Sequence, residues 1–189
     1  MPYEIVVIGS SWGGAAALTR IIRGLPGSFP IPVLLVQHRR AAHETMLADM
    51  LQEATRLRVS EPADQDPLRK GSVYIAPANA HLLVEEGRLR LGDGPPVRHS
   101  RPSIDVTLSS AARAYGPRAV GVVLTGANAD GSCGLRAIVD AGGCAIVQDP
   151  ASAEMPLMPA AARKLVPEAE VIPLEHIAAR LAGLVRRAG

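Results

Sequence analysis

Short, strongly apolar segments recur along this chain, and stretches of helical pattern separate them. Glu4–Ile8 and Val33–Gln37 are the first two, with a predicted helix over Gly13–Leu25 between them. An apolar run without polar alternation indicates a strand buried on both faces, as in parallel sheets covered by helices. The later predicted elements are helix Glu44–Ala54, strand Gly71–Ala76, helix Ser103–Tyr115, strand Val120–Leu124, helix Gly134–Ala141, strand Cys144–Val147, a helix near Ala160–Leu165 and a last helix Leu174–Arg187.

The middle of the chain has a different pattern. Leu82–Glu85 and Arg88–Leu91 alternate around Glu86-Gly87, a pair typical of a tight hairpin turn. The sequence therefore predicts an α/β fold: a doubly wound, mostly parallel sheet with helices on both faces and a small antiparallel hairpin insertion. We find no internal repeat and no long linker, and 189 residues with 48% apolar content suffice for one core. We expect a single domain over residues 1–189.

Composition argues against several functional classes. Twenty basic against 18 acidic residues give a net charge of +2, and 3% aromatic content offers little for base stacking, so we expect no nucleic-acid partner. The N-terminus has no leader pattern, and we find no apolar stretch of about 18 residues, so we expect a cytoplasmic protein without membrane insertion. Cys133 and Cys144 lack a CxxC partner or a nearby histidine cluster. We expect both to be small core residues, with no metal and no cofactor.

The turn after the first predicted strand carries the clearest chemical motif. Its residues are Gly9-Ser10-Ser11-Trp12-Gly13-Gly14, which fit G-x-S-x-G. Glycines remove Cβ atoms where strand and helix nearly collide, so the Ser11 hydroxyl is expected to be exposed at the end of the sheet. The backbone N–H of Trp12 would point toward a developing oxyanion. Ser10 is expected to face inward or to cap the helix, and the turn alone is also compatible with phosphate binding.

A base is predicted at the same end of the sheet. His38 directly follows the second predicted strand, and if the first two strands are neighbours, their ends lie about 5 Å apart. An imidazole at that position can reach a serine hydroxyl. A lone histidine at a strand end is more often structural, so it is the position relative to Ser11 that favours catalysis.

An orienting acid is predicted in the loop after strand Val120–Leu124. Asp130 lies there between glycines and is the first candidate, although an N-cap for the following helix is the alternative. Asp149, at the end of the next strand, is the reserve. The order Ser, His, Asp differs from that of the α/β-hydrolases, so the sequence favours a convergent triad on another doubly wound sheet.

With these motifs the chain resembles the catalytic domain of the chemotaxis protein-glutamate methylesterases. The resemblance covers nearly the whole chain, because six segments occur in the family's order. They are Val7-Ile8-Gly9-Ser10-Ser11 with Gly13-Gly14, Gln37-His38, Tyr74-Ile75-Ala76-Pro77 with His81-Leu82, Arg101-Pro102-Ser103-Ile104-Asp105-Val106, Leu124-Thr125-Gly126 with Asp130-Gly131, and Gln148-Asp149 followed by Met158-Pro159.

The resemblance implies hydrolysis of γ-glutamyl methyl esters on chemoreceptor signalling helices, with release of methanol, and often deamidation of receptor glutamines. By the same resemblance Ser11 is the nucleophile, His38 the general base and Asp130 its orienter. The backbone N–H groups of Trp12 and Ala127 would form the oxyanion hole.

Three departures from the family pattern bear on these expectations. Thr125-Gly126-Ala127-Asn128 stands where the family commonly has Thr-Gly-Met-Gly, which keeps a backbone donor. Arg39-Arg40-Ala41-Ala42 replaces Met-Pro-Pro-Gly, so the substrate rim is changed. We expect Arg39 and Arg40 to line that rim and meet acidic residues of a receptor helix. No receiver domain precedes Glu4, so we expect a stand-alone enzyme that is open by default.

Two other functional classes stay open at this stage. A dinucleotide-binding oxidoreductase would use the glycine turn and Arg39-Arg40, but Ser11 stands at the second glycine of G-x-G-x-x-G and no acidic residue ends the second strand. A non-catalytic receptor-binding module on the same fold would keep the architecture without turnover.

Overall fold

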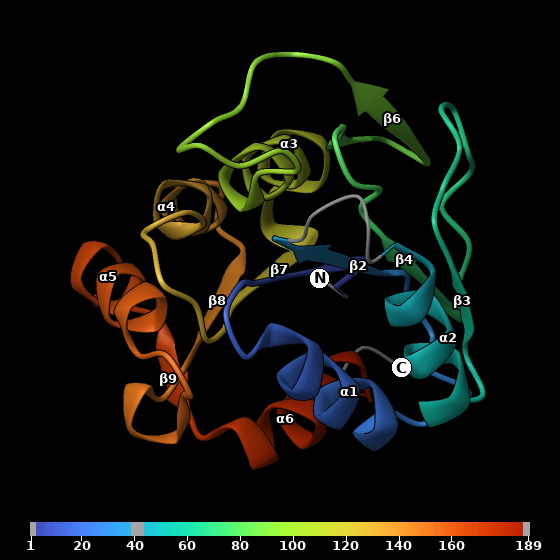
Figure 1. Ribbon diagram of the computed structural model, residues 1–189. Coiled ribbons are helices and arrows are strands. Elements are labelled where there is room, and N and C mark those ends of the chain that lie inside the picture. The colour runs from blue at the N-terminus through green and yellow to red at the C-terminus, as the bar shows by residue number, and fades with distance from the viewer. Residues whose placement is uncertain (1–2, 39–43, 187–189) are drawn as a thin grey trace.

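A seven-stranded parallel sheet forms the centre of the structure, a computed structural model that describes residues 3–38 and 44–186 (Figure 1). Its strand order is β3-β4-β2-β1-β7-β8-β9, which places β1 in the middle. The strands are β1 (Ile5–Ser10), β2 (Val33–Gln37), β3 (Arg58–Ser60), β4 (Ser72–Ile75), β7 (Ala119–Val123), β8 (Cys144–Gln148) and β9 (Glu170–Ile172).

Helices cover both faces of this sheet and enclose two apolar cores. Helices α3 (Ile104–Tyr115), α4 (Ser132–Asp140) and α5 (Leu157–Leu165) pack on one face, and α1 (Gly14–Gly24), α2 (Glu44–Ala54) and α6 (Leu174–Arg186) on the other (Figure 1). Side chains of β1 alternate between them: Val7 belongs to the first core, and Val6 and Ile8 to the second. The strand is buried throughout because both of its faces are covered.

A two-stranded antiparallel hairpin, β5 (His81–Glu85) and β6 (Arg88–Gly92), lies against α3. Side chains of the helix bind its backbone: the Thr107 hydroxyl donates to the Leu82 carbonyl at 2.8 Å, and Ser110 Oγ accepts the Val84 N–H at 2.9 Å. The turn contains Gly87 with φ of 78°, a left-handed conformation that suits glycine. The hairpin extends the layer of α3 outward rather than joining the main sheet.

The predicted fold class is confirmed, and the differences concern weak elements. The sequence patterns missed β3 and β9, which are three residues long, and largely half-buried with one exposed residue each, so they lack a clear apolar run. Helix α5 begins at Leu157, earlier than expected. The expectation for Cys133 is wrong, because this thiol is exposed on α4; Cys144 is partly buried. Among the described residues, no helix has the length and apolar character needed to cross a bilayer.

The topology brings three loops to one point. β1 pairs with β2 in the register Ser10↔Gln37 and with β7 in the register Gly9↔Val123. The residues that follow these strands therefore meet at the carboxyl edge of the sheet, and the helices after β1 and β7 leave to opposite faces. Ligand sites of doubly wound sheets lie at such a switch point.

We predict that Gly9→Ala destabilises the fold by about 1–3 kcal/mol, because a Cβ there would lie 2.9 Å from Cγ1 of the fully buried Ile104. Gly183→Ala is the matched control. A Cβ at that position in α6 meets no atom within 4 Å, so we expect a gain of about 0.5–1 kcal/mol. Equilibrium urea unfolding measures both, and a Gly9→Ala protein as stable as the parent would contradict the packing described.

Candidate active site

The turn after β1 holds Ser11 by its backbone and leaves its side chain half-buried. The Ser11 N–H donates to the Thr125 carbonyl at 2.9 Å, which extends the β1–β7 ladder by one step. The Ser11 carbonyl accepts the Gly14 N–H at 2.9 Å and Gln37 Nε2 at 2.8 Å. Both sides of the residue are thereby fixed, and the residue stays half-buried at the edge of the sheet.

Ser10 has the opposite environment. It is fully buried, and its hydroxyl donates to Gln37 Oε1 at 2.6 Å. The inward orientation predicted for Ser10 is confirmed. Gln37, at the end of β2, thus binds Ser10 by its oxygen and Ser11 by its nitrogen, so one side chain sets the shape of the turn.

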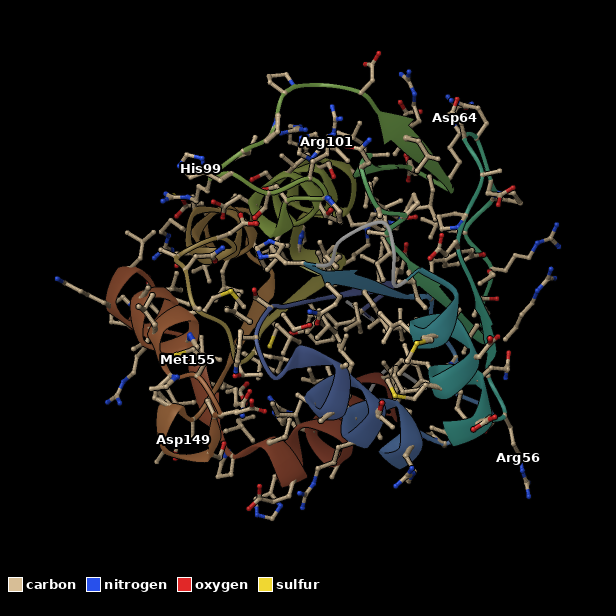
Figure 2. The ribbon with its side chains drawn as sticks, in the orientation of Figure 1. Arg56, Asp64, His99, Arg101, Asp149 and Met155 are labelled. Carbon is tan, nitrogen blue, oxygen red and sulfur yellow. The ribbon has the colours of Figure 1, made fainter. Side chains whose placement is uncertain are left out.

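The loop after β7 approaches Ser11 closely. A Cβ on Gly126 would lie 2.9 Å from Cβ of Ser11 and 2.7 Å from Cε of Met158, so only glycine fits there. Thr125 Oγ1 donates to the Trp12 carbonyl at 2.9 Å and accepts the Met155 N–H at 2.9 Å. The Thr125 N–H donates to Oε1 of Gln148, which ends β8. Figure 2 shows Met155 beside the start of α5.

His38 leaves the end of β2 and reaches the loop after β7. Its backbone N–H donates to the Ser10 carbonyl at 3.1 Å, and its Nε2 lies 2.7 Å from Asp130 Oδ2. The imidazole is mostly buried and the carboxylate completely so, with side-chain exposures of 11% and 0%. The structure thus brings His38 and Asp130 together, next to the turn that carries Ser11.

The Asp130 carboxylate is bound by the N-terminus of α3. It accepts the N–H of Ile104 at 2.7 Å, the N–H of Asp105 at 3.0 Å and the hydroxyl of Ser103 at 2.9 Å. Burial raises the pKa of this carboxyl, but the hydrogen bonds from His38 and from the two N–H groups outweigh it and hold the pKa of Asp130 below its ordinary value. Asp130 is therefore ionised and oriented at neutral pH.

Asp130 does act as a helix cap, but not for the helix that follows it in the sequence, which was the expected alternative. It caps α3, whereas its own helix α4 receives the carboxylate of Asp105 at the N–H groups of Gly131 and Gly134. The reserve acid Asp149 instead caps a short turn by accepting the Ala151 N–H at 3.0 Å. Figure 2 shows Asp149 below Met155, on the side away from α3.

The second ring nitrogen of His38 has two weaker polar neighbours. Ser100 Oγ lies 3.5 Å from Nδ1, and Asn128 Nδ2 lies 3.4 Å from it. Because Nε2 donates to the Asp130 carboxylate, the neutral ring carries its lone pair on Nδ1. No hydrogen bond joins His38 to the Ser11 hydroxyl in the described ranges, and such contacts commonly tighten only when substrate binds. Nδ1 is the nitrogen left to act on a serine.

Two backbone N–H groups belong to the segments that meet at Ser11: that of Trp12, which follows the serine, and that of Ala127, which follows Gly126 in the loop after β7. Over residues 3–38 and 44–186, no protein acceptor binds the N–H of Trp12 or of Ala127. The Trp12 side chain is 62% exposed, and its indole N–H donates to Glu154 Oε1 at 3.0 Å. A tetrahedral oxyanion needs free N–H groups of this kind beside the serine that attacks the ester.

Several residues of this site gave no interpretable signal in the sequence alone. As site residues, Gln37, Thr125 and Ser103 entered only through the resemblance, although Gln37 ends a predicted strand and Ser103 begins a predicted helix. Ser100 and Glu154 were not recognised. The one local signal was Ser103 two residues before Asp105, a serine N-cap pattern. Arg39, Arg40 and His43 lie outside the described residues. Within the described ranges, no three metal-ligating side chains gather.

Comparisons with known proteins agree with this geometry. A family model described as CheB methylesterase matches residues 6–181. The chain is similar to protein-glutamate methylesterase/protein-glutamine glutaminase 2 of Anaeromyxobacter dehalogenans, with 46% identity over 97% of this chain and 54% of that protein. It is also similar to a putative protein-glutamate methylesterase/protein-glutamine glutaminase of Leptospira interrogans, with 41% identity over 94% of this chain and 93% of that protein.

A solved structure is similar as well. The crystal structure of the Thermotoga maritima CheB methylesterase catalytic domain matches with a TM-score of 0.92 and 34% identity, covering 98% of this chain and 100% of that one. The chain thus spans about half the length of the Anaeromyxobacter relative and nearly all of the Leptospira one.

We predict that neutral His38 is the Nε2–H tautomer, because Nε2 contacts a carboxylate that can only accept. Long-range ¹H–¹⁵N spectra of histidine-labelled protein should show a protonated-type shift on Nε2 and a lone-pair shift on Nδ1. His81 is an internal control, since its Nε2 lies 3.0 Å from the Pro95 carbonyl and its Nδ1 accepts the Ser103 N–H. The reverse assignment at His38 would contradict the geometry.

Proposed function

The chain belongs to the CheB methylesterase family, and from this membership we propose that it is a serine hydrolase that cleaves γ-methyl esters of glutamate side chains. The observation that carries the proposal is the buried contact between His38 and Asp130 beside the turn that carries the half-buried Ser11. A histidine held by an ionised, fully buried carboxylate next to a serine on a G-x-S-x-G turn is the arrangement that acyl transfer requires.

In the proposed reaction Ser11 Oγ attacks the ester carbonyl while Nδ1 of His38 takes its proton. Asp130 holds the ring by Nε2–H and stabilises the imidazolium. The tetrahedral intermediate collapses as methanol leaves with the proton from His38. Water then attacks the acyl-enzyme with His38 again as base, which releases the glutamate carboxylate and restores Ser11.

The oxyanion of each tetrahedral intermediate is assigned to the backbone N–H groups of Trp12 and Ala127. Both are without an acceptor in the part of the chain that the structure describes. Thr125 supports this assignment because it holds the backbone on both sides of the Trp12 N–H. Its carbonyl accepts the Ser11 N–H, and its hydroxyl donates to the Trp12 carbonyl. Since the donor at position 127 is backbone, alanine serves there as well as a larger residue.

The proposed substrates are methylated glutamates on chemoreceptor signalling helices, which would make this a cytoplasmic adaptation enzyme of chemotaxis. The names of the Anaeromyxobacter and Leptospira relatives pair this activity with glutaminase activity. The same site can hydrolyse a glutamine side chain, with ammonia leaving in place of methanol. Methanol release from methylated receptors incubated with the purified protein tests the first activity, and ammonia release tests the second.

The substrate rim has a described part and an undescribed one. The role of Arg39 and Arg40 as contacts for acidic receptor residues stays a prediction, since they lie outside the described residues. Two exposed apolar side chains stand on described segments that adjoin the site: Trp12, which follows Ser11, is 62% exposed, and Leu157, which begins α5, is 50% exposed. An apolar rim suits the packed face of a helical substrate.

The dinucleotide alternative meets an obstacle at the glycine turn. A Cβ on Gly13 would lie 2.6 Å from Glu154 Oε2, so a carboxylate covers the start of α1, where a pyrophosphate would bind. The Glu154 side chain fills the space beside Gly13 that a pyrophosphate would need, which disfavours a dinucleotide. A flat titration of NADPH fluorescence is the expected result.

We predict that Ser11→Ala lowers ester turnover on the order of a millionfold, because it removes the nucleophile. Ser10→Ala is the matched control: it loses one hydrogen bond to Gln37 and should cost about tenfold or less. A fluorophosphonate should add its mass to the Ser11 peptide only. Absence of labelling in folded protein would favour a non-catalytic receptor-binding module.

We predict that Asp130→Asn lowers turnover by up to about 10⁴-fold, because an amide neither enforces the tautomer nor stabilises the imidazolium. Asp149→Asn should stay within about tenfold, since it weakens only the cap at Ala151. Turnover of a small activated ester measures both, with urea unfolding as the check on folding. A greater loss in Asp149→Asn would mean that the acid is misassigned.

A further inference from the structure

Arg98, in the loop between β6 and α3, binds one of two neighbouring buried carboxylates, Asp105 and Asp130. Asp130 is the one that contacts His38. Asp105 lies in the first turn of α3, is 7% exposed, and accepts the N–H of Gly131 at 2.9 Å and of Gly134 at 2.7 Å. Asp130 accepts the N–H groups of Ile104 and of Asp105 itself. Asp130 therefore caps α3, whose first turn contains Asp105. Asp105 in turn caps α4, which begins just after Asp130.

Two buried carboxylates in such proximity repel each other, and a cation is needed nearby. Arg98 provides it: its Nε donates to Asp105 Oδ2 at 3.0 Å, and one of its terminal nitrogens lies 3.3 Å from Cys133 Sγ. Burial raises the pKa of Asp105 and the Asp130 carboxylate adds to the rise, while the Gly134 N–H and Arg98 oppose it. A half-exposed Arg98 thus binds one carboxylate of the pair, and the mostly buried His38 binds the other.

The backbone around Arg98 is unusual for its sequence. Val97 and Ser100 exchange backbone hydrogen bonds of 3.1 and 2.9 Å, and between them Arg98 and His99 have φ of 49° and 64°. Two consecutive left-handed residues form a turn type that normally uses asparagine and glycine. Figure 2 shows His99 on this loop, above α4 and to the left of α3.

The same turn reaches the imidazole. Ser100 Oγ lies 3.5 Å from His38 Nδ1, two residues after the arginine that binds Asp105. Other ionisable groups around the cluster are Cys133 on α4 and His81, whose Nδ1 accepts the Ser103 N–H. A strained turn that touches both the imidazole and the second carboxylate is typical of a functional site.

We propose that Arg98 and Asp105 are positioning residues of the hydrolase: this ion pair holds the Asp130 loop and sets the net charge that His38 experiences. The proposal rests on the proposed function for its catalytic meaning. Asp105 adds a negative charge that favours the imidazolium, and Arg98 offsets it. Replacing Asp105 should therefore disfavour the His38 imidazolium, and replacing Arg98 should favour it.

The test is an NMR titration of histidine-labelled protein, together with the pH dependence of ester turnover. Asp105→Asn keeps an oxygen acceptor for Gly131 and Gly134 but removes the negative charge, so the His38 midpoint should fall by about 0.5–1 pH unit. Arg98→Met removes the more exposed cation, so the midpoint should rise by about 0.3 unit. The acid limb of turnover should move with it.

Two further variants separate charge from structure. The double variant removes one charge of each sign and should return the midpoint to within about 0.2 unit of the parent. Arg98→Lys keeps the cation and should leave the midpoint close to the parent value. Shifts of the same sign in the two single variants, or lower turnover with unmoved midpoints, would overturn the proposal. Opposite shifts in a protein that releases no methanol would support the ion pair and refute the proposed function instead.

Discussion

The Asp130 carboxylate is the group on which the rest of the site depends. A fully buried charge is tolerated only when donors replace the water it has lost, and here four donors do so: two N–H groups of α3, the Ser103 hydroxyl and His38. The donors come from a helix on one face of the sheet and from the end of β2, while the carboxylate comes from the loop after β7. One side chain therefore fixes the relative positions of three elements.

The turn that carries Ser11 is fixed by a second set of buried polar groups. Beyond the last paired residues of parallel strands the backbone loses its ladder partners, and buried N–H and C=O groups need replacements. Gln37 at the end of β2 and Gln148 at the end of β8 supply them, the first to the Ser11 carbonyl and the second to the Thr125 N–H. These side chains hold the loops on both sides of the serine without contacting a reacting atom.

The sequence predicted the central parallel strands and the placement of Ser11 and His38 at the same edge of the sheet, because apolar runs indicate burial and neighbouring parallel strands end at the same edge. Apart from His38, it did not predict the partners of Asp130. Ser103 and the N–H of Ile104 lie more than twenty residues away along the chain, and only the packing of α3 against the sheet brings them near. The left-handed turn at Arg98 and His99 could not be predicted from the sequence either, since neither residue type favours a positive φ. The edge strands β3 and β9 were missed because short, partly exposed strands have no distinct pattern.

The direction of the helices explains why the polar chemistry gathers where it does. A helix that precedes a parallel strand runs opposite to it, so α1, α3 and α4 all begin at the carboxyl edge of the sheet, each with a partial positive charge at its N-terminus. Two of these N-termini are occupied by carboxylates, Asp130 on α3 and Asp105 on α4. At α1, Glu154 binds the indole of Trp12 rather than its backbone N–H. Among these three helix starts, α1 is the one whose adjoining backbone N–H, that of Trp12, has no carboxylate acceptor in the described residues. This N–H lies beside Ser11, where the proposed reaction develops its negative charge.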